Sequence, residues 1–83
     1  MRTYLYRVIL RPEPEGGYTV LVPALPGCVT YGVDVAEAVA MAREAIELYV
    51  ESLIEHGEEV PSEEGTLEYA LTVTYAEAAN PDA

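Results

Sequence analysis

The sequence predicts a single α+β domain in which three short strands, one long helix and a fourth strand follow one another. Three observations predict this order. Apolar residues alternate over residues 3–11 and 66–75, they recur at steps of three and four over 35–53, and Pro and Gly clusters separate the segments. The chain of 83 residues has room for one domain, spanning 1–83 with an ordered core over about 3–75.

The first half of the chain is expected to form an antiparallel meander. Its strands are predicted over residues 3–11, 18–23 and 28–32. The segment 12–17 contains two prolines and two glycines, which end a strand and favour a hairpin turn. A second Pro and Gly cluster over residues 23–27 separates the second strand from the third.

The helix is predicted from residue 35 to about His56. Asp34 is a good N-cap, and Glu37 three residues later completes a pattern that resembles a capping box. Gly57 suits the left-handed position that follows a helix. One continuous apolar stripe is expected to face the sheet, and it consists of Val35, Ala38, Val39, Ala42, Ile46, Tyr49, Val50 and Leu53.

The fourth strand is predicted over residues 66–75, with the alternate residues from Leu67 to Tyr75 facing the helix. A helical crossover favours pairing parallel to the first strand. Residues 76–83 are expected to be a frayed tail. One helix covers one face of such a sheet, so the other face is expected to form a homo-oligomer, most simply a dimer. The residues assigned to this oligomer face are Leu5, Arg7, Ile9 and Leu21.

The charge of the chain narrows the choice of partner. Four arginines, no lysine and fifteen acidic residues give a net charge of −11 and a pI near 4.1. This composition lacks the basic surface needed for direct nucleic-acid binding, and anionic membranes would repel it. A basic protein is the natural partner, although acidity also serves solubility alone.

The helix carries an acidic ridge, defined here as Glu47, Glu51 and Glu55, whose like charges stack at a spacing of four residues. Such stacking costs a few tenths of a kcal/mol per pair (about 0.2–0.5), so helix stability alone does not favour it. We expect this ridge, together with Glu44, to bind a partner. The alternative is an ordinary solvated helix face.

No catalytic, cofactor or metal site is expected. Two-metal nuclease chemistry needs converging carboxylates, and the first predicted strand contains none. His56 suits the C-terminal end of the helix dipole, and Cys28 reads as a small buried hydrophobe. A single cysteine excludes an internal disulfide. No apolar run approaches the roughly 18 residues of a membrane span, and the N-terminus is not a signal peptide, so a cytoplasmic location is expected.

One block of sequence resembles a known family. Residues 17–32 (GYTVLVPALPGCVTYG), followed by the Glu- and Ala-rich helix over 35–51, resemble the N-terminal domain of the HicB antitoxin family across nearly the whole chain. Many members have an Asp before Leu-Pro-Gly, where this chain has Ala24. Many also continue into a DNA-binding domain, which is not expected in this polypeptide.

This resemblance implies a partial ribonuclease-H-like fold and a non-enzymatic antitoxin that inhibits a basic mRNA-cleaving toxin of the HicA type. Two other readings of the sequence stay open. One is a stand-alone oligomeric interaction or scaffold module without a toxin, and the other is a degenerate hydrolase that still binds a ligand.

Overall fold

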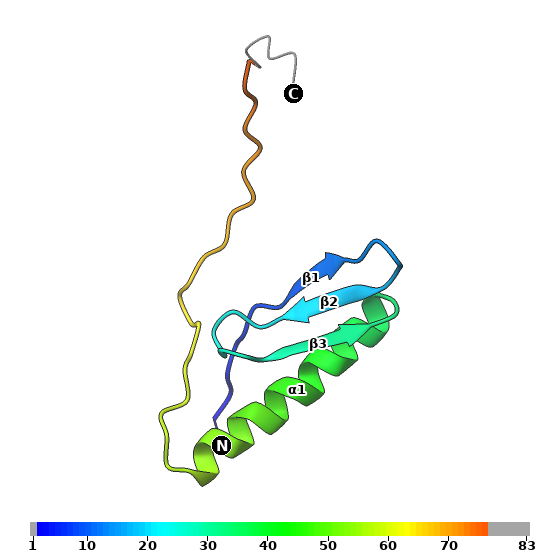
Figure 1. Cartoon of the computed structure of the whole chain (residues 1–83). Helices are drawn as coiled ribbons and strands as arrows, with labels where there is room; N and C mark the ends of the chain where they lie inside the picture. Colours follow the sequence, from blue (N-terminus) through cyan, green and yellow to red (C-terminus); the bar gives the residue numbers. More distant parts are fainter. Residues whose placement is uncertain (1, 77–83) are drawn as a thin grey trace.

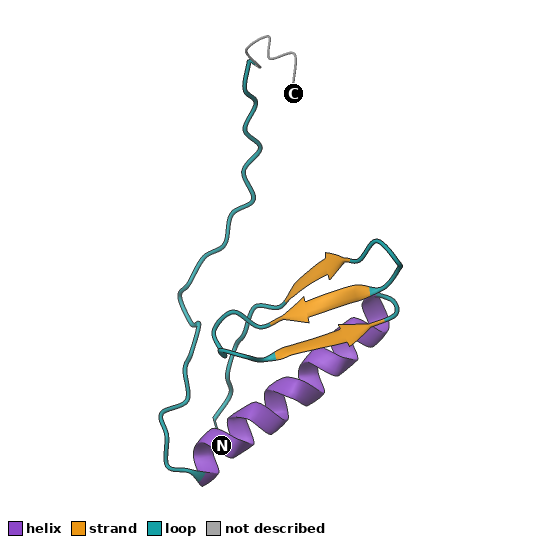
Figure 2. Cartoon of the chain, viewed as in Figure 1, coloured by secondary structure: helices purple, strands orange, loops and turns teal. Residues whose placement is uncertain are grey.

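The structure, a computed structural model that describes residues 2–76, contains a three-stranded sheet with one long helix on one of its faces (Figures 1 and 2). The strands form an antiparallel meander in the order β1-β2-β3, which confirms the α+β class and the predicted meander. The elements are β1 (Ile9–Pro12), β2 (Tyr18–Leu21), β3 (Val29–Gly32) and α1 (Val35–Glu55).

The first strand is shorter than predicted. It begins at Ile9, whereas the sequence predicted a strand from residue 3. Ile9 pairs with Leu21, the last residue of β2. Just beyond Leu21 the chain leaves the sheet at Pro23, which has no N–H, and the N–H of Leu25 donates to the carbonyl of Val22 at 3.0 Å. Residues 3–8 therefore lie opposite a turn, and the prediction of a strand over that stretch is wrong.

The ends of α1 follow the predicted capping. The N–H of Glu37 donates to Oδ1 of Asp34 at 2.8 Å, and Oε1 of Glu37 accepts from the N–H of Val33 at 2.8 Å. At the other end Gly57 has φ +68°, and the N–H of Glu58 donates to the carbonyl of Leu53 at 2.9 Å. This is a Schellman arrangement, which satisfies carbonyls that the helix leaves free.

The core lies between α1 and the sheet face that carries Val20. Val20, Ala38 and Ala42 are buried together, and the small alanines allow the helix to approach closely. The approach is closest at Gly32, where an added Cβ would collide with the backbone of Ala38. A second buried cluster joins the turn after β2 to the helix, and it consists of Val22, Leu25 and Cys28.

The sheet does not contain the predicted fourth strand. Residues 66–75 run as an extended segment that leaves the domain (Figure 1). Their apolar side chains are exposed and are not packed against α1. Leu67 is 76% exposed and Leu71 is 83% exposed. Contacts of the preceding residues with Arg7, described below, direct the chain away from β1. The predicted tail over 76–83 lies outside the described residues, apart from Ala76.

Candidate functional site

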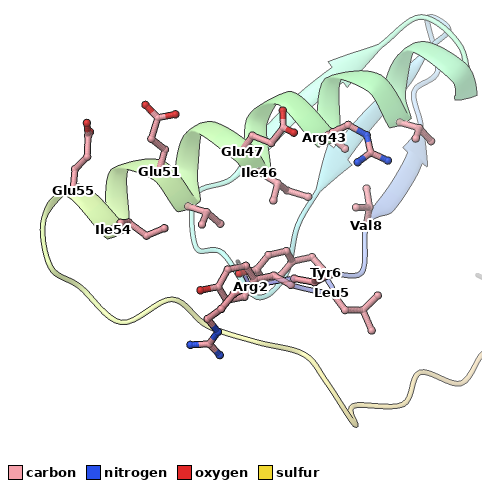
Figure 3. A pocket seen from close by; sticks show the side chains of 15 residues that line it. Arg2, Leu5, Tyr6, Val8, Arg43, Ile46, Glu47, Glu51, Ile54 and Glu55 are labelled. Atoms are coloured by element: carbon pink, nitrogen blue, oxygen red, sulfur yellow. The ribbon is translucent and has the colours of Figure 1, made fainter.

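A groove of about 1040 Å³ runs between residues 2–8 and α1 (Figure 3). Ile46 and Ile54 point from the helix toward the opposite wall, and Val8 closes the end nearest to β1. The apolar residues that line the groove are Leu5, Val8, Val39, Ala42, Ile46, Val50 and Ile54. A surface of this kind on a small domain is typical of a binding site for another polypeptide.

The groove arises because the predicted apolar stripe of α1 is wider than the sheet that covers it. Ala38 and Ala42 are buried against the sheet, as expected. Val39 is 49% exposed and Ile54 is 59% exposed, because no strand lies beyond β1 on that side of the described chain. The prediction of one buried stripe is therefore correct for the part of the helix beneath the sheet and wrong for the part beside it.

The wall opposite the helix is aromatic. The rings of Tyr4 and Tyr6 stack with centroids 6.3 Å apart, and the Arg2 guanidinium lies 5.2 Å from the Tyr4 centroid. The Tyr6 hydroxyl donates to the carbonyl of Pro61 at 2.6 Å. Loss of solvation raises the pKa of the Tyr6 phenol, and the neighbouring Tyr4 and Glu63 add to the effect.

Arg7 and Glu63 join the linker after α1 to the segment that precedes β1. The Arg7 N–H donates to one oxygen of the Glu63 carboxylate at 2.6 Å, and the Arg7 guanidinium donates to the other at 3.1 Å. The same guanidinium donates to the Thr66 carbonyl at 2.8 Å and lies 3.2 Å from Glu68. We call the Arg7–Glu63 pair the latch. Sequence reasoning missed it, because Glu63 stands in an acidic loop with no periodic signal.

The acidic ridge borders the groove. Glu47, Glu51 and Glu55 line its edge, with Glu51 and Glu55 pointing away from the opposite wall (Figure 3). Glu44 is exposed and does not line the groove. Within residues 2–76 both ion pairs involve Arg7, so Glu44 and the three glutamates of the ridge carry no ion pair there. The structure thus brings three of the predicted partner-binding residues to one edge, and their role in binding stays a prediction.

The four residues predicted to form an oligomer face lie in three different places. Ile9 and Leu21 are paired across β1 and β2 on the face that α1 does not cover, and Val29 continues their row on β3. Leu5, 57% exposed, lines the groove, whereas Arg7 belongs to the latch. The uncovered sheet face is therefore smaller than the sequence suggests.

The side chains of Cys28 and His56 lie in surroundings typical of structural residues. Burial raises the pKa of the Cys28 thiol, which favours the unreactive protonated form. Nδ1 of His56 lies 2.7 Å from the Ser52 carbonyl within the last turn of the helix. Residues 2–76 hold no group of three or more His, Cys, Asp or Glu side chains able to bind a metal ion. In the same part of the chain, no helix has the length and apolar character to cross a bilayer.

The described residues thus define a small acidic α+β domain with an apolar groove and an acidic edge beside it. A family model described as the HicB-like antitoxin of bacterial toxin–antitoxin systems matches residues 6–80, and the chain belongs to this family.

Several relatives are similar over two thirds of the chain or more. The UPF0150 protein Ta0767 of Thermoplasma acidophilum is 48% identical over 56 residues, which are 68% of this chain and 81% of that protein. The UPF0150 protein ssr1765 of Synechocystis is 46% identical over 61 residues, covering 74% of this chain and 77% of that protein. Antitoxin HicB of Escherichia coli K12 is 39% identical over 56 residues, covering 68% of this chain and 41% of the antitoxin.

Proposed function

We propose that this chain is a non-enzymatic antitoxin that binds and inhibits a small, basic, mRNA-cleaving toxin of the HicA type. The match to the HicB-like antitoxin family over residues 6–80 is the observation that carries the proposal. A relative named antitoxin HicB supports the same reading. Because the target of such a toxin is mRNA, the pair would act in the cytoplasm.

The charges of the chain support a basic partner. A net charge of −11 attracts cationic proteins from a distance, and the acidic ridge concentrates part of it along one helix edge. These glutamates have no ion pair within residues 2–76, so lysines and arginines of a toxin could bind them without displacing an internal cation. We assign Glu44, Glu47, Glu51 and Glu55 to this contact.

The proposal also includes a partial ribonuclease-H-like fold, in which residues 66–75 join the sheet as a fourth strand beside β1. The alternation from Leu67 to Tyr75 and the free outer edge of β1 support this arrangement. We also propose that residues 1–83 act as one domain that contacts its partner protein directly.

A kinetic experiment tests the role of the ridge. The probe is a catalytically inactive HicA-type toxin, and the measured quantity is its association rate over a range of salt concentrations. Exposed charges mainly set association rates, so Glu47→Lys/Glu51→Lys/Glu55→Lys should slow association and flatten its salt dependence. The matched control is Glu15→Lys/Glu58→Lys/Glu59→Lys, which makes the same change in net charge at exposed positions elsewhere.

The two triple variants separate a local contact from a general charge effect. A larger loss of association rate for the ridge variant supports the assignment. Equal losses would mean that only net charge matters and that the ridge is an ordinary solvated face.

A stand-alone oligomeric scaffold is the second candidate, and the exposed apolar segment over 66–75 favours it. A scaffold would self-associate and would not bind the HicA-type toxin at any salt concentration.

A further inference from the structure

Residues 66–75 present an apolar face that has no cover in the single chain. Leu67, Tyr69, Leu71, Val73 and Tyr75 alternate with smaller or polar residues, and all five are at least 69% exposed. Residues 69–75 contain no charged side chain, in a chain with fifteen acidic residues. An extended, uncharged, alternating segment is the form in which a strand adds to an exposed sheet edge.

The same molecule carries a surface that matches this segment. Strand β1 is an edge strand, and the N–H of Arg7 points outward to Glu63. The N–H of Glu13 donates to Gly17 and that of Val22 donates to Cys28, so the ladder turns the backbone groups of Ile9 and Arg11 toward β2 and those of Leu10 toward the outer edge. Beneath this edge lies the apolar groove, whose floor is formed by exposed parts of α1.

The latch makes it difficult for a chain to fill its own groove. Pro61, Glu63 and Thr66 are already fixed beside Tyr6 and Arg7. A segment that followed its own β1 from this point would run toward Pro12, away from the end of the groove that Ile54 lines. Instead, the chain beyond Thr66 departs from the domain (Figure 1).

We propose that two copies of this chain exchange residues 69–75, each placing the apolar side of the segment in the groove of the other, beside the outer edge of its β1. The exchange is reciprocal, so two-fold symmetry covers both apolar segments and both strand edges at once. The incoming residues 69–75 bring no charge to the acidic ridge. The ridge stays at the rim, where the proposed toxin contact requires it, although the exchange does not depend on a toxin.

The first test is the mass of the full chain at tens of micromolar, measured by sedimentation. Two chains of 9.0 kDa give an expected mass of 18.0 kDa. Leu71→Glu places a charge on the apolar side of the segment and should weaken the dimer about 100-fold or more, because the charge would be buried twice in each dimer. Leu71 is exposed in the single chain, so this variant should leave the domain folded.

Two further variants identify the interface. Thr72→Glu adds the same charge one residue away, on the opposite side of the segment, and should leave the dimer intact. Ile9→Glu places a charge on the sheet face that α1 does not cover, and it should weaken the dimer less than Leu71→Glu does. A monomer at this concentration, or a dimer that Ile9→Glu dissociates and Leu71→Glu does not, would overturn the proposal.

A mixed-dimer experiment distinguishes exchange from a strand that folds back within its own chain. One copy carries Cys28→Ala and a spin label at Thr72→Cys, and the other carries Cys28→Ala and ¹⁵N. The label should broaden the amide signals of residues 5–11 in the ¹⁵N copy. In a second sample the isotope is placed in the labelled copy. Broadening that occurs only in this second sample would contradict the exchange. So would a groove whose amides are protected from solvent only when a toxin is added.

Discussion

Glu63 is bound twice by Arg7, a residue 56 positions earlier in the chain, through the backbone N–H at 2.6 Å and through the guanidinium at 3.1 Å. Glu63 is 8% exposed, which makes it the one buried acidic residue of the described chain. A buried carboxylate with charge-assisted hydrogen bonds holds its position well. This pair therefore fixes the linker after α1 and sets the direction in which residues 66–75 leave the domain.

Glu63→Ala should lower the free energy of unfolding by about 1–3 kcal/mol, because the N–H of Arg7 would lose its partner at a partly buried site. Urea denaturation measures the change. Glu64→Ala is the matched control, since Glu64 is exposed and its side chain makes no ion pair within residues 2–76. Equal stability of the two variants would show that the latch contributes nothing.

Alkaline pH should release the linker. The folded-state pKa of Tyr6 is raised, so its contribution to stability is complete below the ordinary tyrosine pKa of 10.0 and is lost as pH rises through the folded value. The urea midpoint should therefore begin to fall as the pH rises above about 10. Tyr6→Phe should make the urea midpoint less dependent on pH, whereas the exposed control Tyr69→Phe should leave this dependence unchanged. The same dependence of the urea midpoint on pH in both variants would exclude Tyr6 as the titrating group.

Gly32→Ala should be strongly destabilising, because its Cβ would collide with the Ala38 backbone and push α1 from the sheet. The expected loss is about 1–3 kcal/mol, typical of overpacking. Gly27→Ala separates this effect from backbone strain: φ at Gly27 is +80°, and a Cβ there meets nothing within 4 Å. Its expected cost is about 1 kcal/mol. A harmless Gly32→Ala in thermal or urea unfolding would contradict the close helix contact.

Asp34→Ala should cost about 1 kcal/mol by removing the acceptor for the N–H of Glu37 at the start of α1. Asp34→Asn keeps an acceptor oxygen and should lose less. Urea unfolding of both variants measures the difference. An equal loss would assign the effect to the negative charge at the helix N-terminus instead of to the cap.

Local signals in the sequence predicted the parts of the fold that local interactions determine. The capping of α1 by Asp34 and Glu37, its end before Gly57 and the hairpin between β1 and β2 all depend on residues close together in the chain. The resemblance to the HicB antitoxin family was likewise visible in a compact block of residues, and the family model that matches residues 6–80 confirms it. Such features need no knowledge of distant contacts.

The parts that sequence reasoning missed depend on distant contacts. The alternation over residues 66–75 predicted an extended segment with one apolar side, but periodicity does not state which edge or which copy it meets. The latch joins residues 56 positions apart, so neither Arg7 nor Glu63 carries a local signal for it. The apolar stripe of α1 was visible, whereas the groove depends on where the sheet ends.

Growth on co-expression shows whether this chain neutralises a basic toxin. Cells that express a HicA-type toxin should stop growing, and the unmodified chain should restore growth. The ridge variant Glu47→Lys/Glu51→Lys/Glu55→Lys should restore it less well than the charge-matched variant Glu15→Lys/Glu58→Lys/Glu59→Lys. If the unmodified chain, produced in soluble form, restores no growth, the antitoxin function is contradicted.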